Sequence, residues 1–300
     1  MNILGISCFF HDAAAALLVD GRLVAAAEEE RFTRRKHDYS FPENAIRFCL
    51  AKGKLEGRDL DYVVFFEKPF VKFERILMTS LQMFPRSWRV FREAMLTWLS
   101  DKLWVKSTIQ RVVGIDGGRI LFSEHHLSHA ASAFFCSPFD EAALLTVDGV
   151  GEWATASLGV GRGTEIRLLR ETRFPHSLGL LYSAFTAFLG FEVNEGEYKV
   201  MGMAPYGRPR YVDEVHKLIH VCADGSFWLD MDYFSFHCST ERTYNARFEG
   251  LFGRPRDPQA PFFTPGTGYP LYYGDKPANY EALGRENQRY ADIAASIQAV

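Results

Sequence analysis

Two histidines and an aspartate stand where they can bind one metal ion. His125 and His129 lie four residues apart in a segment with no Gly or Pro before Pro138, so a helix places both imidazoles on one face. Asp148 follows the short apolar run 142–147, which predicts a buried strand with this carboxylate at its tip. Imidazole nitrogen and carboxylate oxygen suit a divalent transition metal that keeps positions open for a substrate.

The histidine spacing is also found where no metal binds. Histidines one helical turn apart are common on solvated faces or as hydrogen-bonded core groups, so the pair alone does not establish a metal site. His126 is an alternative partner for His129, because it lies three residues before it and can replace His125. The glycines after the strand, Gly149 and Gly151, favour a nearby ligand because their backbone N–H groups can face phosphate oxygens.

The strand patterns indicate a duplicated α/β architecture. Two groups of three short strands are expected, at residues 2–10, 13–19 and 22–27, and again at 142–147, 153–160 and 165–171. Asp20 and Gly21 predict a tight hairpin in the first group. His11 and Asp12 form a polar turn after its first strand, where they can meet a ligand. The repetition suggests two lobes with a nucleotide cleft between them, and two unrelated meanders are the alternative.

Helical patterns occupy much of the remaining chain. The expected helices cover residues 43–52, parts of 70–111, 177–189, 196–204 and 287–300. The apolar positions of 70–111 favour a core role, with a border of the acceptor pocket as the alternative. Lys199 lies in one helix, where a lysine is usually solvated, but the flanking Gly202 allows backbone to approach a phosphate. Residues 224–279 predict loops, short strands and a candidate lid.

Composition and charge describe an ordinary globular chain. It has 300 residues, 47% hydrophobic and 24% charged, and a net charge of -3, which gives no electrostatic reason to expect nucleic acid. Five scattered cysteines without C-x-x-C spacing argue against a disulfide framework and favour a reducing cytoplasm. Since no leader pattern or membrane-length apolar run is found, we expect neither secretion nor membrane insertion.

Several motifs in order resemble one family. These are MNILGISCFFHDAAAALLVDGRLVAAAEEERFTRRKHDYSFPENAI at the start, HHLSHAASAFF from His125, LLTVDGVGEW from Leu144, and GEYKVMGMAPYG from Gly196. Together they are similar to the amino-terminal part of the carbamoyltransferases of the nodulation and antibiotic-biosynthesis type, whose amino-terminal domain is similar to the Kae1 proteins. The resemblance covers most of residues 1–210. It implies the actin, sugar kinase and Hsp70 fold, with a first lobe at 1–140 and a second lobe at 141–300.

The resemblance also implies a reaction. Such enzymes use ATP and carbamoyl phosphate to make carbamoyl-adenylate, then transfer the carbamoyl group to a hydroxyl of a small molecule, such as a natural product or sugar. The implied metal ligands are His125, His129 and Asp148, with iron as the ion, although manganese or zinc also suit them. The implied general base is His11, for which hydrogen bonding to the turn is the alternative role. The candidates for nucleotide or carbamoyl-adenylate binding are Gly149, Gly151, Lys199 and Gly202.

Parts of the family's machinery are not found in this sequence. A further aspartate ligand and the adenylate-forming domain similar to YrdC are expected downstream of Val300, and the second lobe is expected to be incomplete. Two other functions stay open: another ATP-dependent phosphotransferase of the same fold, and a noncatalytic module that binds metal and nucleotide. Phosphoryl transfer with magnesium requires oxygen ligands more than imidazoles, which argues against the first of these. The acceptor and the oligomeric state are not predicted.

Overall fold

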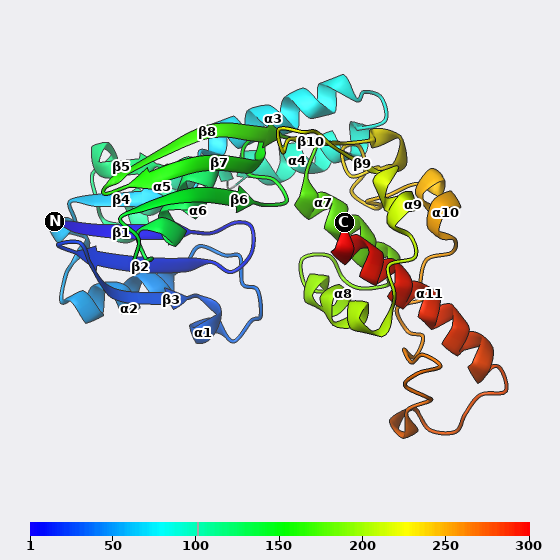
Figure 1. Ribbon diagram of the computed structural model, residues 1–300. Helices are drawn as coiled ribbons and strands as arrows, with labels where there is room; N and C mark the ends of the chain where they lie inside the picture. The colour runs from blue at the N-terminus through cyan, green and yellow to red at the C-terminus, as the bar shows by residue number, and fades with distance from the viewer. Residues whose placement is uncertain (101) are drawn as a thin grey trace.

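The computed structural model describes residues 1–100 and 102–300 and has the predicted α/β architecture (Figure 1). The strands are β1 (Asn2–Ser7), β2 (Ala14–Val19), β3 (Arg22–Glu28), β4 (Tyr62–Phe65), β5 (Ile120–Phe122), β6 (Glu141–Val147), β7 (Ala154–Arg162), β8 (Glu165–Arg173), β9 (Ile219–Val221) and β10 (Phe227–Leu229). The helices are α1 (Glu30–Thr33), α2 (Glu43–Gly53), α3 (Pro69–Gln82), α4 (Trp88–Ser100), α5 (Val105–Val113), α6 (His125–Phe134), α7 (Leu178–Phe188), α8 (Glu197–Met203), α9 (Val212–His216), α10 (Ala246–Phe252) and α11 (Tyr280–Ala299).

The first sheet has five strands in the order β3-β2-β1-β4-β5. Strands β1, β2 and β3 pair antiparallel, as the predicted meander requires, whereas β4 and β5 extend the sheet in parallel. Asp20 and Gly21 both have positive φ angles, 49° and 76°, which fit a tight hairpin whose twist matches that of its strands. Parallel pairing brings the carboxyl ends of β1, β4 and β5 to one edge of the sheet.

The second sheet confirms the second predicted meander. Strands β6, β7 and β8 pair antiparallel in that order, from Glu141 opposite Arg162 to Val147 opposite Ala156. The loop from β6 to β7 carries Asp148 and Gly151 and is closed by a bond from the Gly151 N–H to the Ala154 carbonyl (3.0 Å). Each meander therefore has a polar turn after its first strand.

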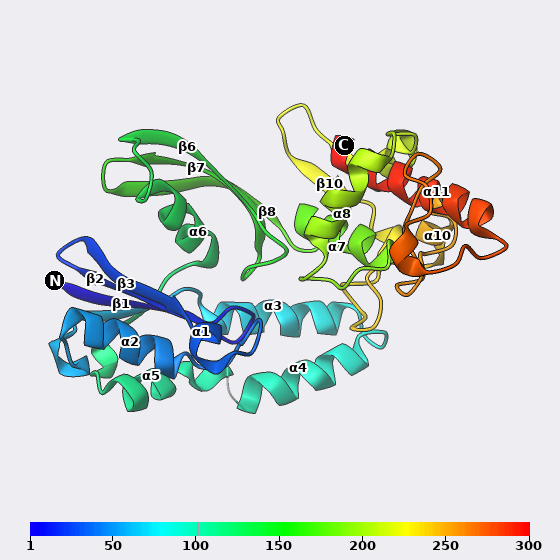
Figure 2. The ribbon, with the colours of Figure 1, turned by 90° about the horizontal axis from the view of Figure 1, so that it is seen from below.

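Helix α6 lies between the two sheets. Figure 2 shows α2 and α5 on one face of the first sheet, and α6 between its other face and β6–β8. The core on the α2 and α5 side contains Leu4, Leu17, Ile46 and Ile109, each fully or almost fully buried. On the opposite face of this sheet, Ser128 of α6 donates to the Phe66 carbonyl after β4 (2.8 Å), and Phe134 of α6 packs with Leu144 of β6 in a small cluster. The histidine helix is thus held to both sheets.

Helices α7 to α11 form a separate body around their own core, at the right of Figure 1. Phe185 and Phe188 of α7 pack edge-on against Phe248 and Phe252 of α10. Helix α11 begins at Tyr280, earlier than the pattern from residue 287 predicts. The segment 253–279 is mostly loop, as expected, with one short 3₁₀ turn.

The core prediction for residues 70–111 is partly wrong. The helices form as expected, and Trp98 is buried, with its ring centroid 6.0 Å from that of Phe73. Leu81, however, is 59% exposed, and Phe70 is 71% exposed. Helices α3 and α4 pack on each other and on the 3₁₀ turn at Lys102–Trp104, and each keeps apolar residues in contact with solvent.

The domain division expected near residue 140 stays a prediction. Its test would be whether each half folds alone. Among residues 1–100 and 102–300, the structure contains no helix whose length and apolar character would let it cross a membrane.

Candidate functional site

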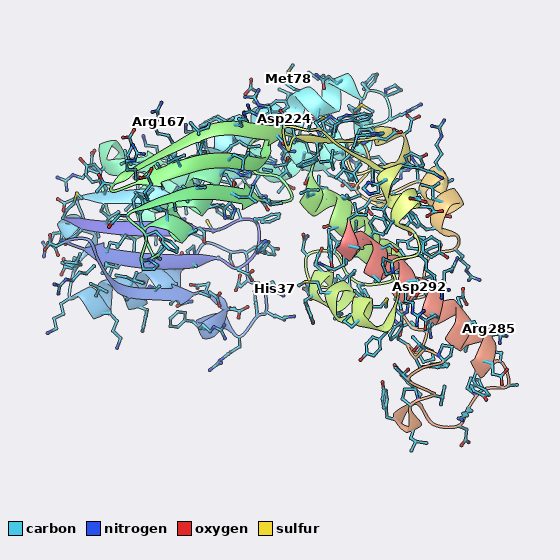
Figure 3. The ribbon with its side chains drawn as sticks, viewed as in Figure 1. His37, Met78, Arg167, Asp224, Arg285 and Asp292 are labelled. Carbon is cyan, nitrogen blue, oxygen red and sulfur yellow. The ribbon has the colours of Figure 1, made fainter. Side chains whose placement is uncertain are left out.

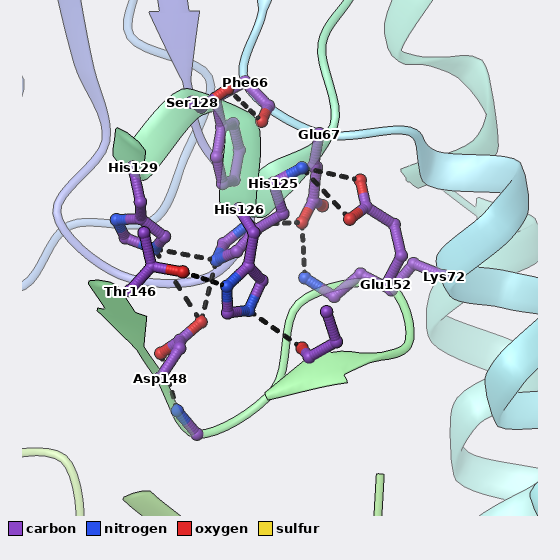
Figure 4. Close-up of polar contacts among 12 residues, drawn as sticks. Phe66, Glu67, Lys72, His125, His126, Ser128, His129, Thr146, Asp148 and Glu152 are labelled. Atoms are coloured by element: carbon purple, nitrogen blue, oxygen red, sulfur yellow. Dashed lines mark hydrogen bonds and ion pairs between the residues drawn. The ribbon is translucent and has the colours of Figure 1, made fainter. Parts of the chain in front are cut away.

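The ends of α6 and β6 bring His125, His129 and Asp148 together (Figure 4). The His125 Nε2 atom lies 2.8 Å from Asp148 Oδ2 and 3.0 Å from His129 Nε2, and His129 Nε2 lies 3.8 Å from Asp148 Oδ2. The helix supplies the two nitrogens from one face, as the four-residue spacing predicts. The strand ends at Val147, so the next carboxylate projects from the sheet toward them.

The structure resolves the ambiguity over His126. This side chain is 2% exposed, and its Nδ1 lies 2.6 Å from Thr146 Oγ1 while its Nε2 lies 2.9 Å from the Ala154 carbonyl oxygen. Because a carbonyl only accepts, Nε2 carries the proton and Nδ1 accepts from the threonine hydroxyl. Burial lowers the pKa of His126 and favours this neutral form. His126 therefore ties α6 to the second sheet and is not a ligand.

Buried charges surround the His125 ring. Glu67 Oε2 lies 3.7 Å from His125 Nδ1 and 2.6 Å from Lys72 Nζ, and both partners are nearly buried. Both carboxylate oxygens of Glu152 accept from the His125 backbone N–H, at 3.1 and 3.0 Å. The ring thus bonds to Asp148 through one nitrogen and faces the Glu67 carboxylate with the other.

This arrangement controls the protonation of the cluster. Burial disfavours the imidazolium, but the Asp148 and Glu67 carboxylates outweigh it and raise the pKa of His125 to about 9. Burial also disfavours the Asp148 carboxylate, yet hydrogen bonds from His125 and His129 hold its pKa well below the usual range. Asp148 is therefore an ionised acceptor at neutral pH.

The cluster fits a divalent metal ion by its donor chemistry. Two imidazole Nε2 atoms face each other at 3.0 Å beside an ionised carboxylate oxygen, and a cation placed among the three can be bound by all of them. Glu67 lies 3.7 Å from the opposite nitrogen of His125, on the side where metal-binding histidines commonly have an outer carboxylate, and this buried nitrogen has no hydrogen-bond partner among the described residues. Among the described residues, no fourth His, Cys, Asp or Glu joins this group.

The backbone N–H groups of the two glycines after β6 are used within their own loop. The Gly149 N–H donates to Asp148 Oδ1 at 2.7 Å, and the Gly151 N–H donates to the Ala154 carbonyl. Gly151 also has a steric reason to lack a side chain, since an added Cβ would lie 2.9 Å from the His125 ring. Participation of these residues in nucleotide binding would require their N–H groups to change partners, and it stays a prediction.

His11 lies in the turn after β1 and belongs to a different group of contacts. Its Nδ1 lies 2.7 Å from Asp12 Oδ2, and the side chain is about half exposed. The neighbouring Phe10 ring contacts Lys72 Nζ at 5.4 Å, and Lys72 pairs with Glu67. A short chain of contacts therefore connects this turn to the His125 ring.

Comparison with known proteins identifies the family. The model of the carbamoyltransferase N-terminus family matches residues 2–300. The chain belongs to this carbamoyltransferase family. An uncharacterized protein of Synechocystis is 49% identical over all of the chain, which covers 46% of that protein. The nodulation protein NolNO of Sinorhizobium fredii is 38% identical over 67% of the chain and 28% of its own length.

This carbamoyltransferase-family chain thus spans less than half the length of these relatives. Among solved structures, YeaZ from Pseudomonas aeruginosa superimposes with a TM-score of 0.32 and 14% identity, over 58% of this chain and 67% of that one. A Ppx/GppA phosphatase of Aquifex aeolicus gives a TM-score of 0.32 and 12% identity, over 70% of this chain and 65% of that one. The actin, sugar kinase and Hsp70 fold is what the family membership implies.

The structure does not join every predicted residue to the cluster. Lys199 and Gly202 lie on α8 in the separate helical body. The ring contacts of Lys199 Nζ, at 6.0 Å from the Phe191 centroid and 5.8 Å from that of Tyr198, stay within that body, so the nucleotide role of α8 stays a prediction. Glu67 was not predicted, although it follows a strand end as Asp148 does, and that signal could have found it.

Proposed function

We propose that this chain carries the transfer site of an O-carbamoyltransferase. In this reaction a carbamoyl group passes from carbamoyl-adenylate to a hydroxyl of a small molecule. The single observation that supports it most is the group of His125 Nε2, His129 Nε2 and Asp148 Oδ2, with separations of 2.8, 3.0 and 3.8 Å, in a member of a carbamoyltransferase family. Iron is the ion that the family resemblance favours, and manganese or zinc also suit these ligands.

The metal site would lower the barrier by electrostatics. A carbamoyl carbon is a poor electrophile because its nitrogen donates electron density into the carbonyl. When bound, the divalent ion would supply Lewis acidity at the carbonyl or phosphate oxygen. His125 and His129 would hold it through Nε2 and Asp148 through Oδ2, while Glu67 keeps the His125 ring in place.

His11 would take the proton of the acceptor. As the hydroxyl oxygen forms its bond to the carbamoyl carbon, the bond from that carbon to the phosphate oxygen of AMP breaks, and AMP leaves. The hydroxyl proton passes to His11 Nε2, the ring nitrogen opposite the one that contacts Asp12. ATP and carbamoyl phosphate would supply the adenylate through a further domain similar to YrdC, with Gly149, Gly151, Lys199 and Gly202 as candidate nucleotide contacts.

The test combines metal content with a transfer assay. The chain is purified without oxygen, its metal is counted, and it is mixed with synthetic carbamoyl-adenylate and a set of simple sugars and polyols. We expect about one transition-metal ion per chain and a release of AMP that depends on the acceptor. His129→Ala and Asp148→Ala are expected to lose both.

A phosphotransferase is the alternative that the same assay would reveal. If the chain moves phosphate from ATP to the same acceptors, and magnesium supports this, the carbamoyl proposal is wrong. If metal binds but neither the carbamoyl group nor phosphate is transferred, and His11→Ala leaves metal and nucleotide binding unchanged, the chain is a noncatalytic module. The imidazole pair does not favour a phosphotransferase, since magnesium prefers oxygen ligands.

A further inference from the structure

The turn that carries His11 has an unusual backbone. Phe9, Asp12 and His37 all have positive φ angles, 70°, 49° and 54°, although none is glycine. Such conformations are uncommon outside glycine and persist where surrounding contacts impose them. Here the Phe9 N–H donates to the Tyr39 carbonyl (2.8 Å), which fixes the turn against the segment that carries His37.

One carboxylate joins two histidines across these segments. Asp12 Oδ2 lies 2.7 Å from His11 Nδ1, and Asp12 Oδ1 lies 2.8 Å from His37 Nδ1. Partial burial acts against the charged form of Asp12, but hydrogen bonds from His37 and His11 outweigh it and lower its pKa. An ionised carboxylate only accepts, so both Nδ1 atoms carry protons. His11 Nε2 is then the nitrogen with a free lone pair.

The other charged groups of the described residues lie around the His11–Asp12 pair, and none lies between the imidazole and the carboxylate. The His37 N–H donates to Glu30 (3.0 Å), and His37 Nε2 lies 3.7 Å from Glu195, which also lies 3.6 Å from Lys36 Nζ. Figure 3 shows His37 on the side of the first sheet that faces α8. Lys72 approaches the turn through the Phe10 ring. The nearest acceptor for the His11 Nδ1 proton is therefore Asp12.

We propose that Asp12 is a positioning residue for His11. It holds the imidazole with the proton on Nδ1 and leaves Nε2 free to take the proton of the acceptor hydroxyl. His37 occupies the second oxygen of Asp12 and fixes the direction of the carboxylate. This inference rests on the proposed function, in which His11 is the general base.

A metal ion bound by Asp12, Glu30 and His37 is the alternative to this positioning role. Asp12, Glu30 and His37 offer ligand atoms within 4.8 Å of one another. Their contacts favour the positioning role, because Asp12 accepts from two imidazoles and Glu30 accepts from a backbone N–H. In the cluster of His125 and His129, by contrast, both Nε2 atoms converge on one carboxylate oxygen and on each other.

The first test observes the tautomer directly. Nitrogen NMR of histidine-labelled protein is compared between the native chain, Asp12→Asn and a matched control, Asp20→Asn. Both aspartates have φ near 49°, a conformation that Asn tolerates, so both variants are expected to fold. We expect His11 to carry its proton on Nδ1 in the native chain and the control. In Asp12→Asn the amide can donate to Nδ1 and move the proton to Nε2. Equal His11 signals in all three proteins would overturn the inference.

The second test measures transfer in a single turnover from carbamoyl-adenylate. We expect Asp12→Asn to reduce the rate constant about 10²-fold or more, with metal content and acceptor KM unchanged, and Asp12→Glu to recover part of it. Transfer that survives Asp12→Asn contradicts the positioning role alone. No transfer by the native chain, with the Nδ1 tautomer in place, contradicts the proposed function. A second metal equivalent that Asp12→Asn removes would assign the place to a metal and overturn the inference.

Discussion

Two groups in this chain combine histidine with carboxylate, and they use their nitrogens differently. In the group of His125, His129 and Asp148, two Nε2 atoms converge on each other and on one ionised oxygen. In the group of His11, Asp12 and His37, each imidazole meets a separate oxygen of one carboxylate. Nitrogens that converge on one carboxylate oxygen suit a cation that displaces their protons, whereas separate hydrogen bonds suit control of a proton.

Burial differs between the first histidine of each group. His125 is 8% exposed and lies between the buried Glu67 and the partly buried Asp148. His11 is 48% exposed and is held by a turn and one carboxylate. The second proposed ligand, His129, is 50% exposed, so the group of His125 is also open to solvent on one side. In the proposed roles, this exposure would let a substrate reach both the ion and the base.

Removal of a ligand is expected to have the largest effect. His129→Ala should reduce metal affinity by more than the roughly 100-fold that loss of an outer-shell partner can cause, because a direct donor is lost. Metal analysis after dialysis measures it. His216→Ala on α9 is the matched control, since that side chain is exposed and lies in the helical body. Full metal content in His129→Ala would show that the convergent pair is structural.

Removal of the proposed base should slow transfer without changing metal binding. His11→Ala is expected to slow carbamoyl transfer about 10²- to 10⁴-fold, the range of general-base catalysis, while metal content stays at its native value. Transfer rates and metal analysis on the same sample give both quantities. If His11→Ala also loses the metal, the two groups form one site and do not have separate tasks.

Loss of the outer carboxylate should weaken metal binding without abolishing it. Glu67→Gln removes the charge that faces His125 Nδ1 at 3.7 Å, and we expect metal affinity to fall about 10- to 100-fold. Competition with a coloured chelator measures the change. Glu74→Gln is the control, because that residue is exposed on the same helix as Lys72. Equal affinities in the two variants would limit the Glu67–Lys72 pair to a packing role.

A pH dependence is expected in the stability of the metal-free chain. The pKa of His125 is raised from 6.5 to about 9, so its stabilising contribution is complete below pH 6.5 and is lost as the pH rises through about 9. The free energy of unfolding should fall by up to about 3 kcal/mol over this window. Denaturant unfolding with a chelator present measures it. His125→Gln should remove most of this decrease in the free energy of unfolding. If the decrease with pH is the same in His125→Gln, a group other than His125 causes it.

Local patterns predicted much of this fold. Strand alternation and the Asp20-Gly21 hairpin located both meanders to within a few residues, because each pattern depends on neighbours in sequence. The four-residue spacing of the histidines and the carboxylate at a strand end likewise brought the three predicted ligands together. Exposure of Leu81 was not predictable, since it depends on how α3 and α4 pack on each other.

The contacts around the site depend on distant parts of the chain. Glu67 and His125 are far apart in sequence, as are Asp12 and His37. The parallel pairing of β4 with β5 brings the first two near each other, and the hydrogen bond from the Phe9 N–H to the Tyr39 carbonyl helps to bring the second two together. The role of His126 was also undecided from sequence, because helical spacing does not show which of two neighbouring histidines will contact Thr146 of β6. Tertiary contacts decided each of these positions.

The hydrogen bond between Thr146 and His126 has a consequence for how a metal ion would enter the proposed site. Thr146 also contacts Ser157 at 2.6 Å, so buried hydrogen bonds join α6 to two strands of the second sheet. These bonds lie beside the proposed ligands and do not involve them, so the spacing of α6 and β6 would be set by the fold itself. Binding of an ion would then require little reorganisation of the protein. The metal that such a site takes would depend on the supply in the surrounding solution as well as on the ligands.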